Sequence, residues 1–152
     1  MRVSVIGGSD IDRETYEQAK ELGRQLASRG HTVVCGGLAG TMEAVCRGAT
    51  AEGGETIGIL PGERRTSAND WVTTPIATGL GNARNAIVVL NGDAAIAVDG
   101  STGTLSEIAL ALDYGRPVAG LDTHSIELDG FQAVDSSEEA IDTVENRVRE
   151  NE

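Results

Sequence analysis

The sequence contains one lysine, two histidines and two cysteines, and these shortages exclude several kinds of catalytic centre. Lys20 falls on the polar side of a predicted helix, which excludes a pyridoxal enzyme because that chemistry needs a lysine Schiff base in the site. His31 and His124 lack the spacing of metal ligands, so we expect no metal site built by the protein alone. No serine lies in a G-x-S-x-G elbow. Cys35 and Cys46 lie in separate predicted elements, and we expect two buried small residues rather than a disulfide.

Basic side chains and long apolar runs are also scarce. The chain carries 24 acidic and 12 basic side chains, a formal net charge of −12. Such a chain repels nucleic acids and anionic membranes, so we expect neither as a partner. No apolar run approaches a membrane span and the N-terminus enters a strand without a signal-peptide pattern, so we expect a cytoplasmic protein. An acidic composition that keeps arginine but not lysine resembles that of cytoplasmic proteins from halophilic organisms.

Glycine, by contrast, is abundant. Twenty glycines and only four aromatic residues favour tight strand-to-helix turns over an all-β core. Strands and helices alternate along the 152 residues, which predicts a single nucleotide-binding, Rossmann-like domain over 1–152: a doubly wound parallel sheet in three α/β/α layers. The predicted strands are 2–6, 32–35, 56–60, 72–77, 94–98 and 117–121. Helices are predicted over 13–29 and 42–51, within 79–90, from about 107 to 112, and after Ser136.

Three local features refine this prediction. Pro75 interrupts the strand over 72–77, which indicates a short strand or one near a sheet edge. The segments 125–128 and 131–134 flank Asp129-Gly130, a pattern typical of a hairpin or of one extended segment with a bend. Ser136 and Glu139 form a capping box for the last helix.

The stretch from Asp93 to Leu112 predicts an anion site. Five small apolar residues, 94–98, favour a strand buried on both faces. A loop of small residues follows, and then a helix begins near Glu107. This arrangement aims free backbone N–H groups and the positive end of a helix dipole at one point, where phosphate most often binds. Glu107 either caps the loop or faces whatever the loop holds.

Two further glycine loops follow predicted strands. Neither is a G-x-G-x-x-G and no Walker sequence exists, so ordinary dinucleotide and Walker-type phosphate sites are excluded. Because the carboxyl ends of parallel strands meet at one sheet edge, we expect one pocket over strands 2–6, 32–35 and 94–98. The predicted lining comprises Gly7, Gly8 and Ser9, the Gly36 to Gly40 loop with Gly37, and Gly100, Ser101, Thr102, Gly103 and Thr104.

The polar loop from Glu63 to Asp70 leaves the same sheet edge. It carries adjacent arginines, Arg64 and Arg65, with Trp71 behind them. Two interpretations stay open: a lid over the pocket, or a solvated loop with Trp71 packed against the core.

Up to about Leu121 the chain resembles the LOG-like Rossmann superfamily. That superfamily includes cytokinin-activating phosphoribohydrolases, proteins once labelled lysine decarboxylases, and molybdenum-cofactor carrier proteins. Its P-G-G-x-G-T-x-x-E motif falls on residues 99–107; Gly103, Thr104 and Glu107 match, whereas Asp99 and Ser101 replace the proline and second glycine. The family's arginine-lysine pair falls on Arg84 and Asn85. Its G-G-G-x-x-G-L-M-G loop falls on 35–43, which keeps Gly36, Gly37, Gly40 and Met42. These departures, with the stretch over 79–85, resemble the carrier-like branch.

The resemblance implies a phosphorylated ligand, bound by the glycine loops with Met42 and Asn85. In the phosphoribohydrolases the residues that match Arg84 and Glu107 are implicated in cleaving the base from ribose 5-phosphate, where positive charge develops on the sugar. Our leading hypothesis is a carrier-type binding protein with molybdenum cofactor as the implied ligand and no built-in cofactor. A nucleoside 5′-monophosphate phosphoribohydrolase acting on AMP-like nucleotides and a module that only senses a nucleotide are the alternatives. Asp99 would weaken phosphate binding unless it points away or binds a hydroxyl or Mg²⁺.

Apolar surface on two helices predicts self-association. The helix over 85–90 is apolar on most faces, and part of the helix over 105–112 is similar. One sheet contact cannot cover this surface, so we expect a homo-oligomer, a dimer or a tetramer.

Overall fold

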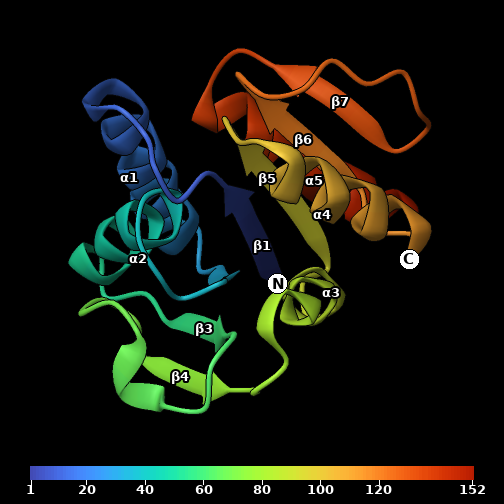
Figure 1. Cartoon of the computed structure of the whole chain (residues 1–152). Coiled ribbons are helices and arrows are strands. Elements are labelled where there is room, and N and C mark those ends of the chain that lie inside the picture. Colours follow the sequence, from blue (N-terminus) through green and yellow to red (C-terminus); the bar gives the residue numbers. More distant parts are fainter.

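The computed structural model describes all 152 residues as one parallel sheet with helices on both faces (Figure 1). The seven strands are β1 Arg2–Gly7, β2 Thr32–Cys35, β3 Thr56–Leu60, β4 Thr74–Ala77, β5 Ala94–Val98, β6 Val118–Leu121 and β7 Phe131–Val134. The helices are α1 Arg13–Ser28, α2 Thr41–Ala51, α3 Arg84–Leu90, α4 Thr102–Asp113 and α5 Ser137–Glu150. Two short 3₁₀ turns, η1 Arg65–Ser67 and η2 Gly81–Ala83, precede β4 and α3. The predicted α/β fold class is therefore confirmed.

The strand order β4-β3-β2-β1-β5-β6-β7 places a topological switch point between β1 and β5. The chain builds outward from β1 through β2, β3 and β4, and then returns to the other side of β1 with β5. All six strand pairs are parallel, and β1 and β5 pair from Val3 opposite Ala94 to Gly7 opposite Val98. Open α/β sheets bind ligands in the crevice at such a switch point.

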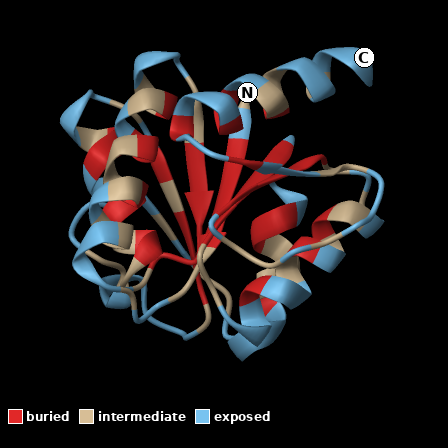
Figure 2. Ribbon diagram, turned by 90° about the horizontal axis from the view of Figure 1, so that it is seen from above, coloured by how far each residue is buried: buried red, intermediate tan, exposed pale blue.

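The two faces of the sheet support two separate cores. On one face Ala94, Ile96 and Val98 of β5 pack with α1, α2 and α5 in a cluster of 21 buried residues. On the other face Ala95 and Ala97 pack with α3 and α4 in a cluster of 10. Figure 2 shows the buried strands between helices whose outer sides are exposed. Because successive side chains of a strand point to opposite faces, the small apolar run of β5 serves both cores.

Helices α1 and α2 approach each other unusually closely. A Cβ on Gly48 would lie 1.8 Å from the carbonyl oxygen of Lys20, and one on Gly23 would lie 2.0 Å from that of Val45. Only glycine permits this backbone contact, so the two helices form a tightly packed pair on one face of the sheet.

Several predicted boundaries differ from the structure. The hairpin interpretation of 125–134 is wrong, because only Phe131–Val134 is a strand and it pairs in parallel with β6. Helix α4 begins at Thr102, five residues before Glu107, because the small residues of the loop already form its first turn. Pro75 does lie in an edge strand, as expected. None of the helices is both long and apolar enough to cross a bilayer.

Candidate functional site

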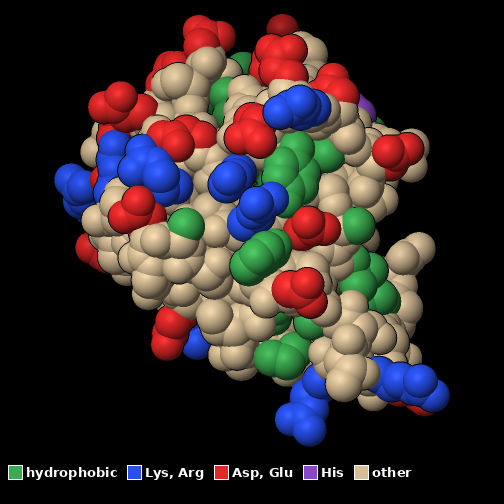
Figure 3. Space-filling model, turned by 90° about the vertical axis from the view of Figure 1, so that its left-hand side faces the viewer, with side chains coloured by type: hydrophobic (Ala, Val, Ile, Leu, Met, Phe, Trp, Pro, Cys, Tyr) green, Lys and Arg blue, Asp and Glu red, His purple; other side chains and the backbone are tan.

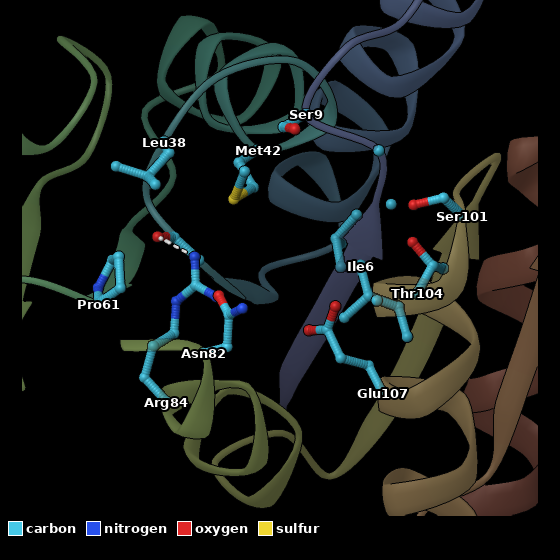
Figure 4. A pocket seen from close by; sticks show the side chains of 15 residues that line it. Ile6, Ser9, Leu38, Met42, Pro61, Asn82, Arg84, Ser101, Thr104 and Glu107 are labelled. Atoms are coloured by element: carbon cyan, nitrogen blue, oxygen red, sulfur yellow. Dashed lines mark hydrogen bonds between the residues drawn. The ribbon is translucent and has the colours of Figure 1, made fainter. Parts of the chain in front are cut away.

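A cavity of about 250 Å³ lies at the carboxyl ends of the central strands, where the sequence places the pocket (Figure 4). Its walls come from β1 and the turn after it, the β2–α2 loop, the end of β3, and the N-terminal parts of α3 and α4. The lining residues are Val5, Ile6, Gly7, Gly8, Ser9, Gly36, Leu38, Met42, Pro61, Asn82, Arg84, Ser101, Gly103, Thr104 and Glu107.

Most of the predicted site residues line this cavity, and five do not. Gly37, Gly40 and Gly100 have positive φ angles of 77°, 67° and 112° and shape the loops behind the wall. Asn85 and Thr102 line a neighbouring hollow of about 480 Å³ between α3 and α4, which shares Asn82 and Gly103 with the first.

Four lining residues lie outside the predicted loops, namely Val5, Ile6, Pro61 and Asn82, whereas Leu38 falls within the predicted Gly36 to Gly40 loop. Pro61 carries a usable signal, since it ends a strand at the ligand-binding edge. The sequence predicts Val5 and Ile6 only as residues of a strand. That they line the cavity depends on tertiary packing.

The guanidinium of Arg84 is fixed by the protein before any ligand arrives. Its Nε donates to the carbonyl oxygen of Ile59 at 2.9 Å, Nη2 donates to that of Gly36 at 3.4 Å, and Nη1 donates to Oδ1 of Asn85. Arginine has five N–H donors, so two remain for a ligand. The residue is 8% exposed, and this burial lowers its pKa, although the guanidinium stays charged at neutral pH.

Glu107 points into the same cavity from α4, opposite Arg84 (Figure 4). Burial raises the pKa of its carboxyl to about 7, and the positive charge of Arg84 only partly opposes this. No protein donor bonds the carboxylate, so the capping interpretation of Glu107 finds no hydrogen bond to support it. A partly buried acid without a protein partner is available to a ligand.

The helix N-termini around the cavity lack side-chain caps. Asp12 caps α1 by accepting from the Thr15 N–H, and Ser136 caps α5 by accepting from the Glu139 N–H. By contrast, neither Gly40 at α2 nor Ser101 at α4 makes a side-chain capping bond. Helix α3 also begins without a side-chain capping bond, so all three helices that reach the cavity wall are uncapped, and free N–H groups at a helix start attract anions.

Asp99 occupies the entrance of the β5–α4 loop without lining the cavity. It adopts a φ of +52°, and its carbonyl oxygen accepts a hydrogen bond from Oγ1 of Thr123 at 2.7 Å. Its Oδ2 lies 3.7 Å from the place that a Cβ on Gly8 would occupy. The carboxylate thus lies beside the β1–α1 loop, behind the cavity wall.

The loop from Glu63 to Asp70 is bonded to the β2–α2 loop rather than to the cavity. The Asn69 N–H donates to Gly37 O at 2.9 Å, and Asn69 Nδ2 donates to Leu38 O at 2.8 Å. Trp71 is 37% exposed, and the Arg47 guanidinium lies 5.5 Å from its ring centroid. Trp71 is therefore not packed into the core, and no residue from 63 to 71 lines the cavity.

The family follows from a comparison of the whole chain with known families. The model of the SLOG cluster4 family matches residues 1–149. The chain belongs to the SLOG cluster4 family. The LOG-like resemblance drawn from the three loops is thereby confirmed.

Relatives of this SLOG protein include both binding proteins and enzymes. The structure of the molybdenum cofactor binding protein from Rippkaea orientalis has a TM-score of 0.89 at 34% identity, covering 95% of each chain. The molybdenum cofactor carrier protein of Chlamydomonas reinhardtii has a TM-score of 0.89 at 33% identity, covering 97% of this chain and 98% of that one. The cytokinin riboside 5′-monophosphate phosphoribohydrolase of Mycobacterium tuberculosis is 37% identical over 103 residues. That match covers 66% of this chain and 55% of the enzyme.

Proposed function

We propose that this SLOG protein is a carrier-type binder of a nucleotide or phosphorylated cofactor, with molybdenum cofactor as its cargo. The observation that carries the proposal is Arg84, which is fixed by two carbonyls and an amide yet keeps two N–H donors for the cavity. Similarity over nearly the full length of two molybdenum-cofactor proteins supports the choice of cargo.

The cavity offers separate surfaces for the two parts of such a ligand. A phosphate fits the turn from Gly7 to Ser9 and the first turn of α4, where backbone N–H groups lack partners. The apolar side chains of Leu38, Met42 and Pro61 line the other side and suit the flat ring of a pterin or a purine (Figure 4).

Calorimetric titration of AMP and of a pterin phosphate tests the proposal. We expect at least one of them to bind, and the affinity to fall in variants that lack Arg84. A wild-type protein that binds neither ligand contradicts both the carrier and the enzyme hypotheses.

A second candidate function, nucleoside 5′-monophosphate phosphoribohydrolase, is favoured by Glu107. In that reaction the bond between C1′ and the base nitrogen breaks, water supplies a hydroxyl to C1′, and its proton goes to the base. Positive charge develops at C1′ in the transition state, and an ionised carboxylate beside it is stabilising. With a pKa of about 7, Glu107 is substantially ionised at neutral pH and has no competing protein partner.

An assay for free base separates the two functions. A carrier returns intact AMP after incubation, whereas a phosphoribohydrolase releases adenine and ribose 5-phosphate. A module that only senses nucleotides returns intact AMP, binds no pterin phosphate and changes its association state on binding. A cytoplasmic location, a homo-oligomer and a halophilic source remain predictions from the sequence.

A further inference from the structure

Two buried thiols lie next to each other beneath the cavity wall. Cys35 ends β2 and Cys46 lies in α2, and their sulfur atoms are 3.4 Å apart. Both residues are 0% exposed and neither is used by the proposed function. A disulfide has an S–S length of about 2.05 Å, so the bond requires the sulfurs to approach by about 1.4 Å.

The thiol pair is connected to the residues that hold Arg84. The Gly37 N–H donates to Sγ of Cys35 at 3.4 Å, and the preceding carbonyl, that of Gly36, accepts from Arg84 Nη2. A Cβ on Gly36 would lie 2.6 Å from Met42 Sδ and 2.7 Å from Arg84 Nη2, so this residue has no room to move sideways. Any shift of Gly36 therefore displaces the arginine or the methionine of the cavity wall.

We infer that Cys35 and Cys46 form a reversible intramolecular disulfide when the protein meets hydrogen peroxide, and that this bond weakens ligand binding in the adjacent cavity. The disulfide itself is independent of the proposed function, whereas the effect on binding rests on it.

The reaction proceeds in two balanced steps. The Cys35 thiolate attacks one peroxide oxygen, the O–O bond breaks, and the products are a Cys35 sulfenic acid and hydroxide, which takes up the thiol proton as water. The Cys46 sulfur then attacks the Cys35 sulfur, the S–O bond breaks, and the hydroxyl leaves with the Cys46 proton as a second water. Two thiols lose one electron each, and peroxide accepts both.

The order of the two cysteines follows from their surroundings. Either thiol can donate to the other; when Cys46 donates, that bond and the Gly37 N–H lower the pKa of Cys35 against the opposing effect of burial. The bond to Cys35 and burial raise the pKa of Cys46. Cys35 is thus the nucleophile towards peroxide and Cys46 the resolving thiol.

The cavity is the side from which peroxide would approach the pair. Gly36 and Met42 line the cavity, and Cys35 directly precedes Gly36. Met42 Sδ and Arg84 Nη2 fill the space beside Gly36, so the oxidant has to displace one of these side chains to reach Cys35. The reaction is therefore slow compared with that of an exposed thiol, and it is confined to small oxidants.

Peroxide treatment of the full chain, followed by intact mass measurement, tests the disulfide. We expect a loss of two hydrogens per chain that dithiothreitol reverses, in a species that stays a single chain on a non-reducing gel. Cleavage after Glu43 separates the two cysteines, so the Cys35 and Cys46 peptides should part only after reduction. Cys46→Ala, with one thiol left, should not lose two hydrogens and should instead gain oxygen. A wild-type protein that gains oxygen without losing hydrogen, or whose thiols react only after unfolding, overturns the inference.

A ligand-free readout tests the coupling to the cavity. The amide resonances of Gly36 and Gly37 should shift on oxidation and return on reduction in the wild type, and stay unchanged in peroxide-treated Cys46→Ala. AMP affinity of the oxidised wild type should fall about fivefold or more, the low end for coupled sites. Oxidation without a change at Gly36, Gly37 and in AMP affinity refutes the coupling. A protein that forms the disulfide and shifts Gly36 but never binds AMP or pterin phosphate refutes only the proposed function.

Discussion

At the scale of single residues, Arg84 combines burial with preorganisation. A flexible surface arginine loses side-chain entropy when it orders around a ligand, whereas Arg84 has lost it during folding. Its two carbonyl partners come from different strands, Ile59 from within β3 and Gly36 from directly after β2, so the fold itself sets the direction of the guanidinium.

Replacing Arg84 should therefore weaken phosphate binding strongly. We expect Arg84→Ala to cost about 1.5–3 kcal/mol of binding free energy, the scale of a charge-assisted hydrogen bond. Asn85→Ala should cost less binding free energy, because it removes only one of the hydrogen bonds that hold Arg84 and leaves the arginine itself in place. Calorimetry with AMP measures both, with the exposed Arg147→Ala as a control. Equal affinities for Arg84→Ala and wild type would exclude Arg84 from the site.

Glu107 should make the stability of the ligand-free protein depend on pH. Its folded-state pKa of about 7 lies above the ordinary value of 4.5, so the folded state holds the proton more tightly than the unfolded state. Ionising Glu107 therefore lowers the free energy of unfolding as pH rises from about 4.5 to 7. Above pH 7, Glu107→Gln should raise the free energy of unfolding by up to about 3 kcal/mol, because glutamine does not ionise. Urea unfolding of both proteins at pH 4.5 and 7.5 measures the difference. A gain of the same size at both pH values would show that ionisation of Glu107 is not its cause.

The same substitution should also separate the candidate functions. In a phosphoribohydrolase, Glu107→Gln keeps ground-state affinity for AMP and loses turnover, because the carboxylate acts on charge that appears in the transition state. In a carrier the substitution changes affinity only. A variant that changes neither property would show that Glu107 has no role towards the ligand.

At the scale of elements, replacing serine by alanine at a helix start should affect stability differently in a capped and in an uncapped helix. Ser136→Ala removes the capping bond of α5 and should lower the free energy of unfolding by about 1 kcal/mol. Ser101→Ala removes no capping bond at α4 and should stay within about 0.5 kcal/mol of wild type. Because Ser101 lines the cavity, its alanine variant should instead weaken AMP binding. Thermal unfolding and calorimetry on both variants check this, and equal loss of stability would refute the distinction.

The elements also show how far sequence reasoning reaches. The β1, β2 and β5 strands and the loops after them were predictable, because a buried parallel strand followed by small residues is a local pattern. The carbonyls that hold Arg84 were not, since Ile59 and Gly36 lie 25 and 48 residues from it. The hairpin at Asp129-Gly130 failed for a related reason: a local turn signal cannot report that Phe131–Val134 pairs with β6 instead. Nor did the spacing of Cys35 and Cys46 reveal that their sulfurs touch.

At the scale of the whole molecule, the surfaces differ in their suitability for self-association. Over α1, α2 and the β3–β4 segment, acidic and basic side chains intermingle and hydrophobic groups are small and separate (Figure 3). On the opposite side, Leu80, Leu90 and Leu105, in or beside α3 and α4, are 52%, 49% and 42% exposed. Exposed leucines gathered on or beside these two helices favour this side as the interface.

We therefore expect an oligomer that Leu90→Glu dissociates. Light scattering in molar salt should give at least twice the chain mass for the wild type and the single-chain mass for the variant. High salt is needed because a chain with a net charge of −12 repels its copies at low ionic strength. Leu128→Glu, at a leucine that is 60% exposed elsewhere, is the matched control and should stay associated. A monomeric wild type in molar salt contradicts the expected oligomer.

The cavity spans the seam between β1 and β5, and this position has a consequence for protein turnover. Residues 1–90 build one half of the sheet and residues from 94 onward build the other, so a ligand that contacts Ser9 and Thr104 holds the two halves together. A ligand that binds only the folded protein, in which the two halves of the sheet are together, raises the free energy of unfolding. The increase grows with the logarithm of the ligand concentration. Pulse proteolysis should then digest the empty protein first and spare the AMP-loaded one, with no protection in Arg84→Ala. A cell would thus degrade ligand-free copies sooner than loaded ones. The lifetime of each molecule would depend on whether it carries a ligand.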